Sequence, residues 1–398
     1  MYGLVLEGGG AKGSYHIGAW SALRKLGIEF SGAVGTSVGA LNAAVILQGD
    51  YDAARELWEN MTFSSVFNMN DGIFEKIIDY TFKSKDVMEY RDELNTVLKI
   101  DGLDITPLKA TIRKLLKEND LRKMNKLFGL VTISLAEMKG LELFLEDIPN
   151  GHLADMLLAS SYLPVFKLEK LHGKMYLDGG YYNNLPTRML VRKGYKDIIE
   201  IRLHDDAVQF PVNNEEINIV RIEPKENLGS ALDFNNERIQ YNMILGYYDT
   251  LRTFHHLNGE KYYIRIPFEE KEILMFLLEN REKFKDIAQT MGIYQELTCP
   301  ILLEILIPTL KENLGMQEKI DYREFIAGIL EYIGDKLHIY RFRVYDLAEF
   351  LQFILKHNDN LYMKDFSLIE KIKKNHLLTK EIIDLIKGGL QIEEMSTE

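Results

Sequence analysis

Ser37 lies at the centre of a pattern that can do chemistry on an ester. Residues 35–39 read GTSVG, a G-x-S-x-G whose glycines are Gly35 and Gly39. A serine that attacks a carbonyl must stand on a sharp turn between a strand and a helix, and small flanking residues let these elements approach closely. Residues 40–47 predict an apolar helix after the motif. The free N–H groups at its start would face negative charge that develops beside Ser37.

A glycine-rich loop precedes this motif in the chain. Residues 2–6 are apolar and predict a strand, residues 14–26 have apolar positions at helical spacing, and the loop lies between them. Adjacent glycines let backbone N–H groups point at a ligand with no Cβ in the way. The loop residues of interest are Gly8, Gly9, Gly10, Lys12 and Gly13.

Two kinds of site compete for this loop. Its glycines fit the G-x-G-x-x-G pattern of dinucleotide-binding folds, and they also fit an oxyanion hole that receives the negative oxygen of a tetrahedral intermediate. A dinucleotide site needs an acidic residue near the end of the next strand, but Glu29 lies before that strand. A Walker A loop does not fit, because Lys12 precedes the last glycine. The serine motif that follows favours the oxyanion hole.

Ser37 also needs a general base. Histidine is the usual base for a serine nucleophile, but none of the nine histidines lies in a motif that marks it for this role. Asp178 is the better candidate, because it follows a predicted strand and precedes Gly179 and Gly180, which permit close approach to another backbone. An ordinary Asp-Gly turn would explain the same three residues.

Together, the three motifs resemble those of the patatin-like phospholipases. The glycine loop, the G-x-S-x-G and the Asp-Gly-Gly occur in the order of that family. Two further segments are similar to it. One is residues 159–166, ASSYLPVF, and the other is Asn184 with Pro186, which complete a D-G-G-x-x-x-N-x-P. The resemblance covers roughly residues 2–255.

This resemblance implies a Ser–Asp dyad that works without histidine. Ser37 would be the nucleophile, Asp178 the general base and the glycine loop the oxyanion hole, with no metal and no cofactor. A carboxylate is ordinarily a weak base, with a pKa of about 4, so such a dyad requires dry surroundings and strong oxyanion stabilisation. The implied substrate is a phospholipid or another acyl-ester lipid, reached by transient contact with a membrane surface. Lys12 could shape the loop, lie near a phosphate or form a plain salt bridge.

The alternation of predicted strands and helices indicates an α/β fold with a mainly parallel central sheet, and the resemblance implies the three-layer sandwich of the patatin-like proteins. We expect the acyl hydrolase domain at residues 2–268. Residues 269–398 predict helices, with no convincing strand or catalytic motif, and form a separate helical region. This region could cap, regulate or assemble the protein. The alternative function is therefore a signal-regulated effector whose helices gate the active site.

Residues 74–82, which follow the serine motif, contain an amphipathic stripe. Its apolar residues follow helical spacing, with charged residues between them. Ordinary core packing and a lipid-facing lid both explain such a stripe. Its members are Phe74, Ile77, Ile78 and Phe82.

Charge and composition restrict the partners and the compartment. The formal net charge of −12 argues against nucleic acid as the main partner, because phosphate backbones require an excess of Lys and Arg. The one cysteine, Cys299, cannot form an internal disulfide, and we expect it to be a small buried hydrophobic residue. No basic-then-apolar leader precedes the first strand, so we expect a cytoplasmic protein that can associate peripherally with a membrane. The oligomeric state does not follow from the sequence.

Overall fold

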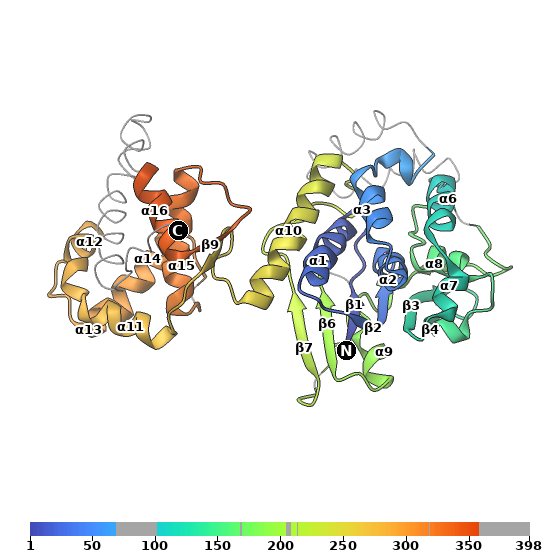
Figure 1. Ribbon diagram of the computed structural model, residues 1–398, viewed down its shortest axis with the longest axis horizontal. Coiled ribbons are helices and arrows are strands. Elements are labelled where there is room, and N and C mark those ends of the chain that lie inside the picture. Colours follow the sequence, from blue (N-terminus) through green and yellow to red (C-terminus); the bar gives the residue numbers. More distant parts are fainter. Residues whose placement is uncertain (69–101, 168, 204–207, 213, 318, 358–398) are drawn as a thin grey trace. The chain divides into compact units, whose positions relative to one another are not determined.

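The computed structural model describes residues 1–68, 102–167, 169–203, 208–212, 214–317 and 319–357 (Figure 1). The chain divides into two compact units, Met1–Thr253 and Phe254–Glu398. The amphipathic stripe, which falls within residues 69–101, and the helices predicted beyond residue 357 lie outside the described residues.

A sheet that has seven strands within the described residues organises the first unit. Its order is β4-β3-β2-β1-β6-β7, and β5 pairs with β3 outside this path. The pairs β1–β2, β1–β6, β2–β3 and β6–β7 are parallel, whereas β4 and β5 run antiparallel to β3. The predicted α/β fold with a mainly parallel sheet is therefore confirmed. The strands are β1 (Tyr2–Leu6), β2 (Phe30–Thr36), β3 (Leu127–Ser134), β4 (Lys139–Phe144), β5 (Tyr176–Asp178), β6 (Asp197–Ile201) and β7 (Asn218–Ile222).

Helices cover both faces of this sheet. Val34 of β2 packs with Met189 of α9, whereas a Cβ on the next residue, Gly35, would meet Gly39 of α2. Because successive strand residues point to opposite faces, α9 and α2 lie on opposite sides of the sheet. The helices of this unit are α1 (Ser14–Lys25), α2 (Val38–Gln48), α3 (Tyr51–Glu59), α6 (Thr106–Leu115), α7 (Glu118–Lys123), α8 (Leu153–Ser160), α9 (Thr187–Arg192) and α10 (Asn236–His255).

The direction of the strands brings the three motifs to one edge of the sheet. β1 and β2 are parallel and in register, with Leu6 beside Gly35, so the glycine loop after β1 and the serine after β2 leave the sheet at neighbouring points. β5 is antiparallel to β3 and pairs Asp178 with Thr132. Val131 precedes Thr132 in β3 and pairs with Thr36. Asp178 therefore ends its strand close to the serine turn.

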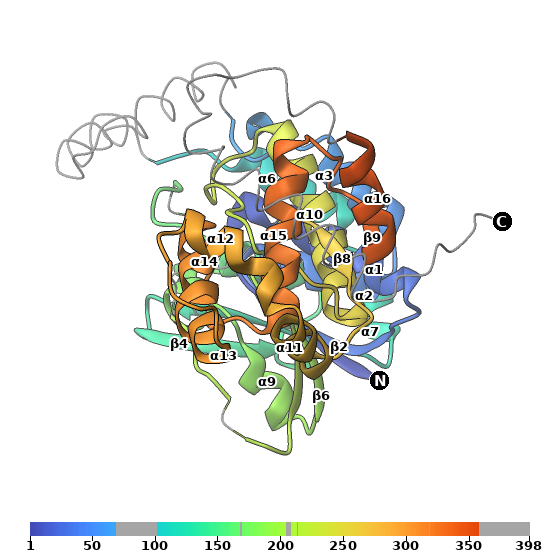
Figure 2. The ribbon, with the colours of Figure 1, turned by 90° about the vertical axis from the view of Figure 1, so that its left-hand side faces the viewer.

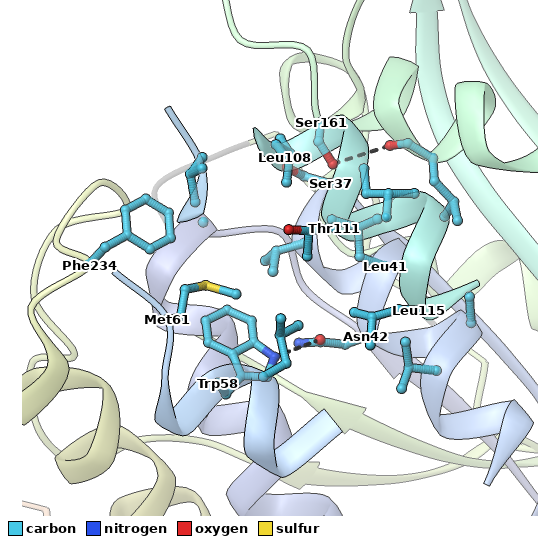
Figure 3. A pocket seen from close by; sticks show the side chains of 18 of the residues that line it. Ser37, Leu41, Asn42, Trp58, Met61, Leu108, Thr111, Leu115, Ser161 and Phe234 are labelled. Carbon is cyan, nitrogen blue, oxygen red and sulfur yellow. Dashed lines mark hydrogen bonds between the residues drawn. The ribbon is translucent and has the colours of Figure 1, made fainter. Parts of the chain in front are cut away.

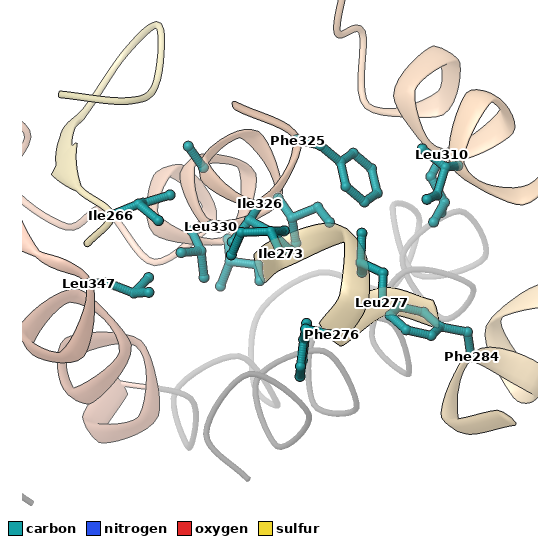
Figure 4. Packing of buried hydrophobic residues seen from close by; sticks show 14 of the residues in the cluster. Ile266, Ile273, Phe276, Leu277, Phe284, Leu310, Phe325, Ile326, Leu330 and Leu347 are labelled. Atoms are coloured by element: carbon teal, nitrogen blue, oxygen red, sulfur yellow. The ribbon is translucent and has the colours of Figure 1, made fainter. Parts of the chain in front are cut away.

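The second unit has its own hydrophobic core. Ile273 and Phe276 of α11 pack with Phe325 and Leu330 of α15 in this core (Figure 4). Figure 2 shows α15 with α14 to its left and α16 to its right in that view. The elements are β8 (Tyr263–Arg265), α11 (Glu270–Glu279), α12 (Lys285–Thr290), α13 (Cys299–Ile301), a π-helical turn (Leu302–Leu306), α14 (Ile307–Asn313), α15 (Tyr322–Lys336), β9 (Val344–Asp346) and α16 (Leu347–His357).

Three expectations about this half of the chain differ from the structure. The compact units separate at Thr253, before the expected boundary at residues 268 and 269, because β8 pairs in parallel with β9 and joins the core of the second unit. The same pairing places a short strand in the region expected to have none. Cys299 is exposed rather than buried, because it begins α13 directly after the N-cap residue Thr298.

Among the described residues, no helix is both long enough and apolar enough to cross a membrane.

Candidate active site

Ser37 stands on a strained turn between β2 and α2. Its backbone has φ 54° and ψ −127°, a positive φ that non-glycine residues rarely adopt. Two close approaches make room for this turn. A Cβ on Gly35 would lie 2.4 Å from the Gly39 carbonyl carbon, and a Cβ on Gly39 would lie 2.3 Å from the Leu6 carbonyl oxygen. The glycines therefore let the strand, the turn and the helix meet at distances that no side chain allows.

The Ser37 hydroxyl contacts Asp178. Ser37 Oγ donates to Asp178 Oδ2 at 2.7 Å, although the residues are 141 positions apart in the chain. Asp178 is only 3% exposed, and its other oxygen, Oδ1, accepts the Gly180 N–H at 2.7 Å. A Cβ on Gly179 would lie 2.2 Å from the Val131 carbonyl oxygen. The Asp-Gly-Gly thus forms a tight turn that aims one carboxylate oxygen at the serine.

The glycine loop is held at both ends by distant carbonyls. Gly8 N–H donates to the Asn184 carbonyl at 3.2 Å, and Ala11 N–H donates to the Ala231 carbonyl at 2.8 Å. Between them, Gly10 has φ 57°, and a Cβ there would lie 2.1 Å from the Ala231 oxygen. Among the described residues, the Gly9 and Gly10 N–H groups have no hydrogen-bond partner.

Lys12 and Gly13 begin the transition into α1. Lys12 N–H returns to the Gly9 carbonyl at 3.2 Å, and the Gly13 carbonyl accepts from Asn42 Nδ2 at 2.9 Å. Of the predicted loop residues, Gly10 lines the same cavity as Ser37.

In the described part of the chain, no histidine lines the cavity that Ser37 faces. His16 is fully buried, and burial lowers its pKa to about 3 against a smaller raising effect of a hydrogen bond with the Ile201 backbone. Its Nδ1 lies 3.2 Å from Asn42 Nδ2. His152 and His172 stack on each other with ring centroids 3.7 Å apart, and neither lines the cavity.

Ser37 opens onto an apolar cavity. The cavity has about 940 Å³ of empty space, which includes its opening to solvent. None of the described side chains that line it carries a charge, and about half of its lining residues come from α2, α3 and α6. Ser37 and Ser161 lie toward one side, and Trp58 lies with Asn42 on the opposite side (Figure 3). Trp58 Nε1 donates to Asn42 Oδ1 at 3.2 Å, so these two polar groups satisfy each other within the wall.

The chain is similar in sequence to proteins of a known family. Residues 4–191 match the family model described as patatin-like phospholipase. These residues, slightly less than half of the chain, therefore match a patatin-like phospholipase domain. A patatin-like phospholipase domain-containing protein of Caenorhabditis elegans is 28% identical over 204 residues, which span 50% of this chain and 13% of the worm protein.

Two solved structures are also similar to the chain. VipD from Legionella pneumophila has a TM-score of 0.38 at 14% identity, covering 100% of this chain and 92% of that chain. The type III effector protein ExoU has a TM-score of 0.32 at 14% identity, covering 97% and 78%. Both scores are low, and the fold assignment of the patatin-like domain rests on its family match and on the sheet itself.

The patatin-like domain holds several site residues that the motifs do not mark. Thr36 Oγ1 donates to the Asn183 carbonyl at 2.7 Å, which ties the serine turn to the segment after Asp178. Ser160 Oγ accepts the Ser37 N–H at 2.9 Å. Ser160 lies in the small-residue segment that the family resemblance includes, but nothing in its sequence context gives its role. The described residues of the domain contain no cluster of His, Cys, Asp and Glu that could hold a metal ion.

Proposed function

We propose that the patatin-like domain is a serine acyl hydrolase that cleaves fatty-acyl esters of phospholipids or related lipids. One observation carries this proposal: the Ser37 hydroxyl lies 2.7 Å from the buried Asp178 carboxylate and also lines an apolar cavity. A nucleophile beside a base, facing a space that accepts a hydrocarbon chain, fits ester cleavage of a lipid.

Asp178 acts as the general base. As Ser37 Oγ attacks the ester carbonyl, its proton passes to Asp178 Oδ2, to which it is already hydrogen bonded. The Gly180 N–H holds Oδ1, so the carboxylate keeps the orientation that this transfer needs. Asp178 then protonates the leaving alcohol, and an acyl ester of Ser37 remains.

The negative oxygen of the tetrahedral intermediate is stabilised by backbone N–H groups. Because the Ser37 N–H donates to Ser160, other donors are needed. The Gly9 and Gly10 N–H groups are suited to this role, since the hydrogen bonds at Gly8 and Ala11 fix the loop on either side. The N-terminus of α2 adds its dipole beside the same oxygen.

Water completes the cycle. A water molecule attacks the acyl ester, Asp178 takes its proton, and the fatty acid leaves as Ser37 Oγ regains a proton from Asp178. The chemistry uses only the dyad and the loop, so we propose no metal or cofactor. We assign no catalytic step to Lys12. From its place in the glycine loop it could either shape the loop or lie near a phosphate of the substrate.

The cavity supports a lipid substrate rather than a dinucleotide. Its lining offers hydrocarbon contacts and no charged side chain to a ligand. β2 ends at Thr36 and passes directly to Ser37, so it does not provide the acidic residue that would bind a ribose. The substrate reaches the site by transient contact with a lipid surface.

Substitution of the dyad tests this proposal. In Ser37→Ala and Asp178→Asn, we expect the release of fatty acid from a phospholipid mixture, followed by mass spectrometry, to fall by roughly a thousandfold or more, because each removes an essential group. Fluorophosphonate labelling should mark wild type and fail in Ser37→Ala. Circular dichroism checks that each variant folds. Wild-type turnover by folded Ser37→Ala would contradict the proposal.

A further inference from the structure

The Ser37 N–H is held by a residue from a distant helix. The ladder of β2 ends at Thr36, and Ser37 is the N-cap of α2, so neither element provides a partner for this N–H. Ser160 Oγ, at the end of α8, accepts it at 2.9 Å. Ser160 is 0% exposed, so water does not replace this bond in the folded protein.

The same hydroxyl also reaches the strand beside Asp178. Ser160 Oγ donates to the Val131 carbonyl at 2.6 Å. Val131 pairs with Thr36, and its carbonyl oxygen lies so close to Gly179 that a Cβ there would be 2.2 Å away. One serine hydroxyl therefore joins the turn that carries Ser37 to the carbonyl against which the Asp178 turn packs.

We propose that Ser160 is a positioning residue for the Ser37 nucleophile, an inference that rests on the acyl hydrolase function proposed above. The Ser37 backbone at φ 54° is strained, and such a conformation persists only where its surroundings hold it. Without the Ser160 hydroxyl, the half-buried Ser37 N–H loses its acceptor, and the turn relaxes to satisfy it. The Ser37 hydroxyl then leaves its alignment with Asp178 and with the oxyanion donors.

A purely structural serine would have a different effect. It would satisfy the Val131 carbonyl and stabilise the fold, but its loss would not change the rate of the folded protein. Ser134, in β3, is a matched control. Like Ser160 it is 0% exposed, and its Oγ accepts a backbone N–H, that of Glu137 at 3.3 Å. It does not line the cavity.

The test compares Ser160→Ala, Ser160→Thr and Ser134→Ala in the full-length chain, with a short-chain p-nitrophenyl ester and a fluorophosphonate. In Ser160→Ala, we expect kcat and the rate of Ser37 labelling to fall by about ten- to a hundredfold, with KM within twofold of wild type, because misplacement of a nucleophile by a fraction of an ångström reduces the chemical step. Ser160→Thr keeps the hydroxyl and should recover most of kcat. Ser134→Ala should keep the wild-type kcat, and thermal unfolding shows how far each variant is destabilised.

Three results would overturn the role of Ser160. These are a kcat of folded Ser160→Ala within twofold of wild type, equal losses of kcat in Ser160→Ala and Ser134→Ala, or equal losses in the Ala and Thr variants of Ser160. Turnover by Ser37→Ala in the same assay would instead overturn the proposed function itself, so the two failures are distinguishable.

Discussion

His16 is a histidine that the fold keeps neutral. It lies in α1, directly after the glycine loop, and is fully buried. Desolvation lowers its pKa from 6.5 to about 3. The neutral ring suits its neighbour, because an unprotonated Nδ1 can accept from Asn42 Nδ2. This places a pH-sensitive group beside the loop that we propose as the oxyanion hole.

The pKa of His16 predicts a pH dependence of stability. Between pH 3 and 6.5 the unfolded chain binds a proton at this residue and the folded chain does not, so stability decreases as pH falls below 6.5. From pH 7.5 to 5.5 this contributes a loss of about 1.4 kcal/mol. Urea unfolding followed by tryptophan fluorescence reports on the first unit, which holds both tryptophans, Trp20 and Trp58.

A matched pair of variants isolates this contribution. His16→Gln should lose about 1.4 kcal/mol less than wild type over this pH range, because the titrating group is absent. His255 is exposed, and His255→Gln should follow wild type. The same pH dependence in His16→Gln and wild type would mean that His16 does not titrate in this way.

At the scale of elements, α2 sets the direction of the cavity. Val38, Leu41, Asn42 and Val45 lie on one face of this helix and line the cavity. From Ser37 to Val45 the helix rises about 12 Å. An extended hydrocarbon chain advances about 1.25 Å per carbon, given C–C bonds near 1.5 Å and angles near 111°, so this face accommodates roughly ten carbons.

Filling the far part of this face should shorten the preferred acyl chain. In Val45→Phe, we expect kcat/KM for a dodecanoyl p-nitrophenyl ester to fall about tenfold or more, because a misfitted apolar contact costs about 1–3 kcal/mol. The butanoyl ester, which reaches only the first turn of α2, should react as in wild type. An equal decrease for both esters would contradict an acyl chain that lies along α2.

At the scale of the whole molecule, the sequence predicts what is local. β1 is found at the expected residues 2–6, and the α1 helix follows its glycine loop, because strand, loop and helix are adjacent in the chain and have clear periodicity. The order of the motifs also points to Ser37 and Asp178, which the fold brings together. The antiparallel pairing of β5 with β3, which delivers Asp178, has no local signature.

Contacts over long sequence distances account for what the sequence does not predict. Ser160 reaches Ser37 across 123 residues, and its own surroundings resemble any small-residue helix end. The cavity combines α2 with α6 and with Phe234, which are separate in the chain. β8 pairs with β9 about eighty residues later, and this pairing places the boundary between the units before β8.

That boundary predicts how the chain can be divided. Tyr262, Ile264 and Ile266 belong to the core of the second unit, and Asn258 Nδ2 donates to Glu324 Oε1 of α15 at 2.8 Å. A chain that ends at Glu269 therefore exposes an apolar strand without its partners, and we expect it to aggregate. A chain that ends at His256 keeps α10 and ends before these residues, and we expect it to be monodisperse in size-exclusion chromatography.

The shorter chain also tests whether the second unit gates the active site. If the helices only stabilise or assemble the protein, residues 1–256 should hydrolyse a short-chain ester with a kcat close to that of the full chain. If they gate the site, removal should change kcat by tenfold or more, with the same unfolding transition of Trp20 and Trp58. Aggregation of residues 1–256 alongside a stable, monodisperse 1–269 would contradict the boundary at Thr253, because the residues after it would then be needed by the first unit.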